Sequence, residues 1–314
     1  MFYEIAITPS VFKTECYASR ELCDSEIRGI WTELNNCLVV RDLRGGDWFK
    51  ELWARKTESP HFAQKALKSL RDGKRLRSFP ISSGNSPSNS GDWCREALSS
   101  HTSSPLDGIL SCAGLKPEIR DESLVCAINN RHGNNTWWTK LVVDGPSRVP
   151  RYTAGYLSAL GVLLRSANHL MIMDPHLDPA HHDYREFKQI LLSAHRSDGV
   201  QPTIEIHRVS YLGVGRQEFP SNHDWEERFK TALKSPLERV GLDAEVFIWP
   251  DEHDRHIISN LGGIHMGNGL KINNDPNDTS TWTRLPPRTA ESVQRQFDPS
   301  VNRPRHRFHI VKSG

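Results

Sequence analysis

Two periods of apolar residues run along the chain and divide it into two parts. The stretch Phe2 to Ile7 alternates as a strand does. Three later segments carry apolar residues three and four positions apart, which is the spacing of amphipathic helices: 25–34, 47–56 and 62–77. We therefore expect the chain to open with an α-rich (α+β) domain.

From about residue 150 onward, helical and strand-like segments alternate. Helices are expected at 153–167, 185–195 and 225–241, and strands at 169–174, 202–212 and 244–249. This alternation predicts an α/β sheet with helices packed on its faces. The segment GPSRVPR, residues 145–151, is the clearest punctuation between the two parts. We therefore expect two domains, residues 1–147 and 148–314.

Residue types that carry chemistry gather in the segment 245–272, EVFIWPDEHDRHIISNLGGIHMGNGLKI. Within it, His253 and Arg255 stand two residues apart, so both side chains project to the same face of an extended segment. A neutral imidazole and a fixed guanidinium on one face can share one phosphate group. An apolar strand ends in Asp174, and His176 follows it. Because ligands gather at the carboxyl ends of strands in α/β sheets, we expect these side chains to lie together.

The spacing resembles the motif of the phospholipase D superfamily, which is H-x-K, four residues, D, six residues, then G-S. Here His253-x-Arg255, four residues, Asn260, six residues and Gly267-Asn268 keep each interval. Arginine replaces the lysine of the motif, and asparagine replaces both its aspartate and its serine.

A closer resemblance is to the phospholipase D-like C-terminal domain of microtubule-interacting-and-trafficking proteins and its bacterial relatives. In that domain an H-D-R segment is followed by G-x-G-L, as at 253–255 and 267–270 of this chain. An apolar strand there ends in D-P-Y, and here Asp174 and Pro175 are followed by His176. The resemblance covers residues 148–314 and implies a phospholipase D-like mixed sheet flanked by helices.

The chemistry of metal-free phosphodiester cleavage assigns a role to each candidate. His253 attacks phosphorus, Arg255 clamps the phosphate, and a second histidine such as His176 protonates the leaving oxygen. The remaining candidates support these three: Asn268 or Asn260 donates a further hydrogen bond, and Asp174 pairs with Arg255. Gly267 and Gly269 offer backbone N–H groups to the anion or, equally well, form turns that require positive φ. No cofactor or metal is expected in this mechanism.

Two other interpretations of the same residues stay open. His176, His181, His182 and Asp183 form a cluster that could bind a metal ion, but metal binding needs convergence that spacing alone does not guarantee. Alternatively, His253 and Arg255 are purely structural and hold the strand ends together through loop carbonyls and Asp174.

The expected function is a phospholipase D-like phosphodiesterase: a metal-independent nuclease, or a nuclease-derived subunit, of a bacterial antiviral defence or mobile-element system. Because enzymes of the superfamily use two motif copies and this chain has one, we expect a homodimer or a larger complex. The trafficking-type domains are regarded as non-catalytic lipid binders. The alternatives are therefore a module that reads phosphate on nucleic acid or anionic phospholipid, and a scaffold subunit.

The net charge of +2 excludes a global basic field, so only local patches could bind nucleic acid. One patch is the run Lys65, Lys68, Arg71, Lys74, Arg75 and Arg77, which is expected to be a solvated helix face or, alternatively, a phosphate-contact strip. A second patch is the NRPRHR stretch, residues 302–307. No segment has the pattern of a signal peptide or a membrane span, so we expect a cytoplasmic protein.

All six cysteines lie in the first 126 residues and none forms a C-x-x-C pair: Cys16, Cys23, Cys37, Cys94, Cys112 and Cys126. Their apolar settings predict reduced side chains that act as small core hydrophobes.

Overall fold

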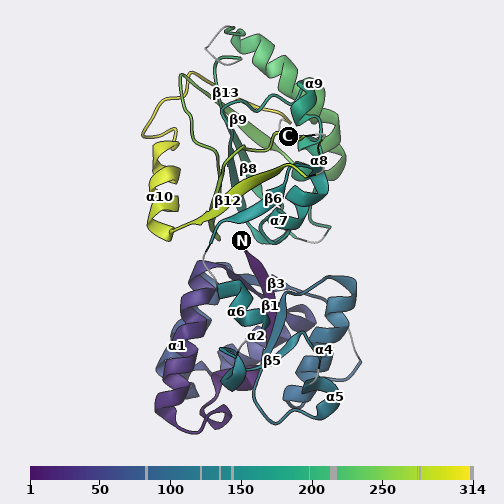
Figure 1. Ribbon diagram of the computed structural model, residues 1–314, viewed down its shortest axis with the longest axis vertical. Coiled ribbons are helices and arrows are strands. Elements are labelled where there is room, and N and C mark those ends of the chain that lie inside the picture. The colour runs from purple at the N-terminus through teal and green to yellow at the C-terminus, as the bar shows by residue number, and fades with distance from the viewer. Residues whose placement is uncertain are drawn as a thin grey trace. The chain divides into compact units, whose positions relative to one another are not determined.

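The computed structural model describes residues 1–81, 84–120, 122–133, 136–142, 145–197, 199–212, 218–273, 275 and 277–311 (Figure 1). The chain divides into two compact units, 2–144 and 145–314, close to the expected boundary after residue 147. Within the described residues, no helix is long and apolar enough to cross a membrane.

The first unit is built on a sheet of five parallel strands in the order β3-β2-β1-β4-β5. The strands are β1 (Tyr3–Ile7), β2 (Leu38–Asp42), β3 (Leu76–Ser78), β4 (Gly108–Ser111) and β5 (Val125–Ala127). The helices around them are α1 (Arg20–Asn36), α2 (Leu43–Ala54), α3 (His61–Asp72), α4 (Ser90–Ser103), α5 (Pro117–Arg120) and α6 (Trp137–Val142), with short 3₁₀ turns η1 (Pro9–Phe12), η2 (Thr14–Cys16), η3 (Lys56–Glu58) and η4 (Ile128–Asn130).

The expectation of an α-rich (α+β) first domain is wrong, because this unit is a doubly wound α/β fold. Its strands are short, and every residue of β2 and β4 is buried. Parallel strands covered on both faces lose the apolar-polar alternation by which a strand is recognised in sequence.

The basic run at 65–77 is not a single solvated face, because its last members are turned into the first unit. Arg77 Nη1 lies 2.7 Å from Oε2 of the fully buried Glu4, which also accepts from Arg41 Nε at 2.8 Å. Arg75 is buried too and donates to the carbonyl oxygen of Leu38 at 3.1 Å. These arginines satisfy the interior polar groups of the sheet, so they are not available to a phosphate backbone.

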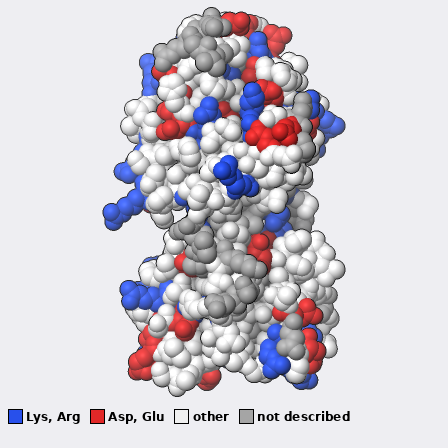
Figure 2. All heavy atoms as spheres, viewed as in Figure 1, with Lys and Arg blue, Asp and Glu red and all other residues white. Residues whose placement is uncertain are grey.

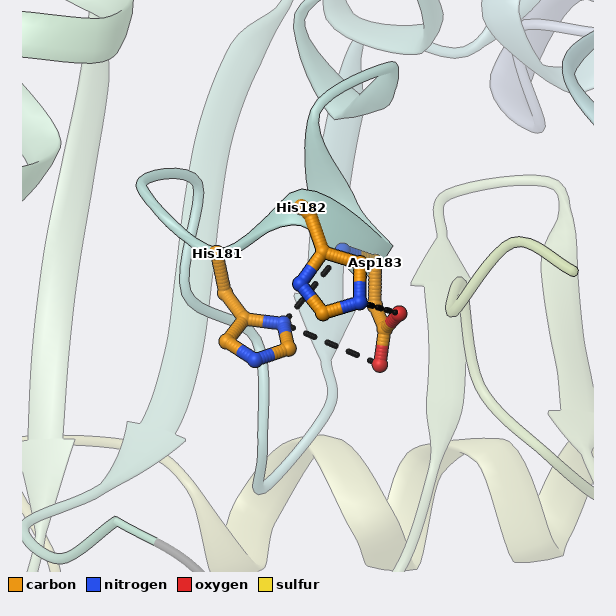
Figure 3. Close-up of side chains that lie close together, drawn as sticks. All are labelled: His181, His182 and Asp183. Atoms are coloured by element: carbon orange, nitrogen blue, oxygen red, sulfur yellow. Dashed lines mark hydrogen bonds and ion pairs between the residues drawn. The ribbon is translucent and has the colours of Figure 1, made fainter.

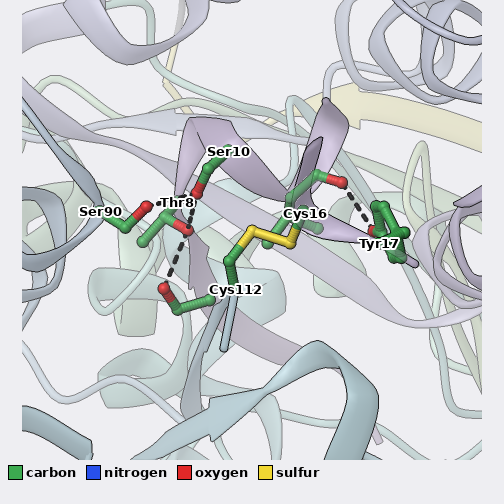
Figure 4. Close-up of a disulfide and its surroundings, with 8 residues drawn as sticks. Thr8, Ser10, Cys16, Tyr17, Ser90 and Cys112 are labelled. Atoms are coloured by element: carbon green, nitrogen blue, oxygen red, sulfur yellow. Dashed lines mark hydrogen bonds between the residues drawn. A yellow bond between two sulfur atoms is a disulfide. The ribbon is translucent and has the colours of Figure 1, made fainter. Parts of the chain in front are cut away.

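Two of the six cysteines form a disulfide, so the expectation that all are reduced is wrong for Cys16 and Cys112 (Figure 4). Cys16 ends η2, which follows β1, and Cys112 directly follows β4. Because β1 and β4 are adjacent parallel strands, the segments that leave their carboxyl ends meet, although the two cysteines are 96 residues apart in sequence. The four other cysteines are free and buried, as expected.

The second unit is built on an eight-stranded mixed sheet in the order β13-β9-β8-β7-β10-β11-β12-β6. Its strands are β6 (Ser147–Pro150), β7 (His169–Met173), β8 (Thr203–Val209), β9 (Ala244–Trp249), β10 (His256–Ser259), β11 (Gly262–Met266), β12 (Thr279–Leu285) and β13 (His306–His309). Strands β7, β8 and β9 are parallel, and the other pairs are antiparallel. The expected α/β class is thus confirmed for this unit.

Helices cover both faces of this sheet (Figure 1). They are α7 (Thr153–Ser166), α8 (Phe187–Leu192), α9 (Asn222–Val240) and α10 (Pro287–Gln296), and a 3₁₀ turn, η5 (His182–Tyr184), precedes α8. The face under α10 is filled by Met171, Met173, Phe247, Trp249, Ile258, Ala290 and Phe297. Both faces being covered, ligands have access mainly to the edges where the strands end.

Candidate functional site

The candidate residues of the second unit lie together at one side of its sheet, where β7 and β11 end and β10 begins. We call this line of strand ends an edge of the sheet. Strand β10 is antiparallel to β7, and their register pairs His256 with Met173. The residue before β10, Arg255, therefore lies beside the residue after β7, Asp174. Strand β11 is antiparallel to β10, so the turn 267–269 that follows it arrives at the same edge. The two loops lie together as expected, although Arg255 precedes its strand instead of ending one.

Asp174 is the fully buried centre of this edge. Its Oδ1 lies 3.9 Å from Arg255 Nε, and the Tyr184 hydroxyl donates to the carboxylate at 3.3 Å. Two backbone N–H groups also donate to it, from His176 at 3.1 Å and from Leu270 at 3.0 Å. The carboxylate thus ties the ends of β7, β10 and β11 together. The sequence predicted its pairing with Arg255 but not the contact with Tyr184.

Gly269 must be a glycine at this place for two reasons. Its φ of 63° lies in the left-handed region, and an added Cβ would lie 2.2 Å from Asp174 Oδ2. The expected role of Gly267 and Gly269 in binding phosphate through N–H groups is not supported. The Gly267 N–H donates to Thr281 O at 3.0 Å, and the Gly269 N–H donates to Met266 O at 3.4 Å. These glycines shape the turn, and their amides are already used within it.

His253 stands in the loop between β9 and β10 with its side chain 76% exposed. Its Nε2 lies 3.7 Å from Asp251 Oδ1, which accepts a hydrogen bond from the Tyr211 hydroxyl at 3.0 Å. A carboxylate beside an imidazole orients the ring. Asp251 thus stands where a positioning carboxylate is needed, and its place two residues before His253 was the available sequence signal.

His176 is half-buried at the same edge. The pKa of its imidazole is lowered, first by burial and then by the positive charges of Arg255, Arg208 and His253, and the Asp174 carboxylate opposes this shift only in part. The His176 N–H donates to the same Asp174 oxygen that faces Arg255, so His176 and Arg255 both adjoin this carboxylate. One chain therefore brings two histidines and an arginine to one edge.

Arg208 stabilises this edge from within, and no local sequence pattern indicated its role. It is almost fully buried at the end of β8, donates to Leu177 O at 2.8 Å and to Tyr211 O at 2.7 Å, and lies 3.6 Å from the Trp225 ring centroid. Burial lowers the pKa of its guanidinium to about 9. Arg208 thereby fixes the loops that follow β7 and β8.

The two asparagines of the motif occupy different ends of the sheet. Asn260 lies in the turn after β10, where its Oδ1 accepts from the backbone N–H of Asn168 at 2.7 Å, at the start of β7. The expectation that Asn260 belongs to the site is therefore wrong, because strand β10 carries it to the opposite edge. Asn268 is exposed in the turn after β11, at the same edge as Arg255, and its N–H donates to Ser280 Oγ at 2.9 Å.

The histidine cluster beside this edge is arranged around Asp183 (Figure 3). His182 Nε2 lies 2.9 Å from Asp183 Oδ1, and His181 Nδ1 lies 3.7 Å from Oδ2. Among the described residues these three side chains form a group that could hold a metal ion. However, Lys271 Nζ lies 2.6 Å from Asp183 Oδ2, so a metal would have to displace an ammonium group. His176 is not part of the group.

The electrostatics of the face shown in Figure 2 are mixed, with Lys and Arg interspersed among Asp and Glu. Beside Asp174 lies a narrow hollow, whose lining includes Arg208, Trp249, Glu252 and Asp254. Its lining thus carries charge of both signs.

Comparisons with known proteins identify no family. No family model and no curated protein matches the chain. A solved structure of TrmBL2, described as an archaeal chromatin protein with a novel mode of DNA binding, matches with a TM-score of 0.31 and 10% identity, over 90% of this chain and 92% of that one. A likeness this low carries no argument about fold or function.

Proposed function

We propose that the second unit binds a phosphodiester at the Asp174–Arg255 edge and cleaves it without a metal ion. The observation that carries this proposal is the pairing of Arg255 with the buried Asp174, to which the His176 N–H also donates, with His253 two residues before Arg255 in the same loop. Arg255 supplies a fixed guanidinium whose fork matches phosphate oxygens. With His176 in the same chain, a second histidine does not require a dimer.

The proposed reaction has two steps. A ring nitrogen of neutral His253 attacks phosphorus, the bond to the leaving oxygen breaks, and protonated His176 gives its proton to that oxygen. Neutral His176 then accepts a proton from water, whose oxygen attacks the phosphohistidine and releases His253 and the product phosphate. Arg255 stabilises the charge on the non-bridging oxygens in both steps. Asp251 acts as a positioning residue for His253.

The test uses bis(p-nitrophenyl) phosphate with the full chain in EDTA. We expect turnover in EDTA, at least about 10³-fold slower turnover for His253→Ala, and loss of both binding and turnover for Arg255→Ala. Asn260→Ala is the matched control, because it alters the same motif at the opposite edge and should leave turnover unchanged.

Three results would overturn the proposal: loss of turnover in EDTA that magnesium restores, full activity of His253→Ala, or equal effects of Asn260→Ala and Arg255→Ala. If the chain binds the diester through Arg255 but releases no nitrophenol, the edge binds phosphate without cleaving it.

A further inference from the structure

Three arginines line one open hollow at the β13 end of the same sheet. The hollow has a volume of about 550 Å³, and its lining includes Ser300, Val301, Arg303, Arg305 and Arg307. All three arginine side chains are exposed. Several guanidinium groups along one concave surface favour a phosphate ligand, because each can donate two parallel hydrogen bonds to it.

The alternation of β13 turns these arginines away from the interior. His306 and Phe308 face α9, where His306 Nε2 lies 2.9 Å from Glu226 and Phe308 packs on Phe229. Arg305 and Arg307 alternate with these two residues and are exposed, and His306 also takes part in the lining of the hollow. Their contacts are weak: Arg307 Nε lies 4.0 Å from Glu245 Oε1 with the side chain 63% exposed, and Arg305 Nη1 lies 3.4 Å from Ser210 Oγ. An exposed ion pair such as Arg307–Glu245 contributes little, and the Arg305–Ser210 hydrogen bond is long, so an incoming phosphate can replace both contacts.

The hollow lies on the same sheet edge as the proposed phosphodiester site. The Arg305 N–H donates to Ile248 O at 2.8 Å near the end of β9, and Ser210 directly follows β8. Four strand-to-strand steps separate β13 from β10 in the sheet order. At about 4.8 Å a step, Arg305 and Arg255 are roughly 19 Å apart along the edge.

We propose that this hollow binds the phosphate backbone of a nucleic-acid strand whose scissile phosphate lies at Arg255. The proposal rests on the proposed function and specifies its substrate class. A separation of roughly 19 Å spans several successive phosphates, since each strand of a duplex advances about 3.4 Å per nucleotide. A concave hollow fits a strand better than it fits the flat surface of a phospholipid bilayer.

The loop between the two sites carries negatively charged side chains. Asp251 and Glu252 are held within the loop, by Tyr211 and by Gln296 respectively. Asp254 is 59% exposed and lies 3.7 Å from His256. A backbone that passes from the hollow to Arg255 must pass this carboxylate. Asp254→Asn should therefore tighten the binding of a long strand and leave the binding of a dinucleotide unchanged.

The experiment compares a 12-nucleotide oligothymidylate with the dinucleotide TpT by fluorescence anisotropy at several salt concentrations. We expect the triple change Arg303→Ala, Arg305→Ala and Arg307→Ala to weaken oligonucleotide binding at least about tenfold and to leave TpT binding unchanged. Each arginine removed should reduce the slope of log K against log salt by about 0.7. Arg239→Ala, a change of an exposed arginine on α9, is the charge-matched control when Arg303, Arg305 and Arg307 are replaced one at a time, and it should have no effect.

The results distinguish an error about the hollow from an error about the Asp174–Arg255 site. If the triple variant binds the oligonucleotide as tightly as the wild type, or loses TpT equally, the hollow is not a backbone site. If the hollow captures phosphatidylserine vesicles in preference to oligonucleotides, its partner is a membrane and the inference is wrong. If Arg255→Ala leaves TpT binding intact while the triple variant still loses the oligonucleotide, the proposed function fails and the nucleic-acid site stands.

Discussion

At the scale of single residues, the site depends on the absence of one carbon atom at Gly269. An added Cβ would meet the Asp174 carboxylate, and the φ of 63° adds backbone strain. Gly241 has almost the same φ, 67°, with nothing within 4 Å of an added Cβ. An alanine would therefore suffer similar backbone strain at both positions, but its Cβ would clash with a neighbour only at Gly269.

We expect Gly241→Ala to lower the free energy of unfolding by about 1 kcal/mol, and Gly269→Ala by about 2 to 4 kcal/mol, because only the second displaces a buried, paired carboxylate. Urea denaturation measures both. Phosphodiester binding should be lost in Gly269→Ala alone. Equal destabilisation of the two variants would show that the carboxylate moves aside at little cost.

Some residues of the site could be predicted from the sequence, and others could not. Asp174, His176 and Arg255 were recognisable because each stands beside a strand end in a loop with turn formers. Tyr184 and Arg208 were not, because Tyr184 stands directly before an expected helix and Arg208 stands within an expected strand. Their roles arise from contacts across the fold, which no local pattern records.

At the scale of elements, the direction of β10 decides which motif residues act together. The strand is four residues long, so its two ends lie about 14 Å apart. Arg255 stands before it and Asn260 after it. Conserved spacing in a motif therefore does not require that all of its members share one site.

We expect Asn260→Asp, which supplies the carboxylate of the phospholipase D motif, to change neither phosphodiester binding nor turnover. Its Oδ1 can still accept from Asn168, whereas Asn260→Ala should cost about 1 kcal/mol of stability by removing that acceptor. Turnover assays and urea denaturation on both variants measure this. A marked gain of activity in Asn260→Asp would show that the far edge takes part in the reaction.

Helices and strands were predictable where the apolar repeat extends over many residues. The helices near 153–166 and 222–240 and the apolar strands between them follow from the sequence pattern, since each is several turns or residues long. Strands β2 and β4 were not recognised. Strand β2 has five consecutive buried residues and β4 has four, so each resembles any short apolar run. Only their pairing with β1 identifies them as strands.

At the scale of the whole molecule, the two units should respond differently to a reducing agent. The Cys16–Cys112 disulfide closes a loop across 96 residues of the first unit. Opening a loop of that size removes about 4.7 kcal/mol of stability in the chain-entropy model. The four free cysteines also lie in the first unit.

We expect dithiothreitol to lower the unfolding midpoint of the first unit and to leave the second unit unchanged, as measured by hydrogen exchange of peptides from each. The double variant Cys16→Ser and Cys112→Ser should match the reduced protein and show no further response. A midpoint that does not depend on the reductant would mean that these thiols are not joined in solution.

The same disulfide determines what becomes of the chain after a single cut. Residues 84–86, in the turn-rich segment before α4, are exposed and lie between the two cysteines. A protease that cleaves there separates β1, β2 and β3 in sequence from β4, β5 and the entire second unit, yet the pieces stay joined through sulfur. Without reductant the nicked protein therefore keeps its full mass, and only reduction releases the amino-terminal fragment.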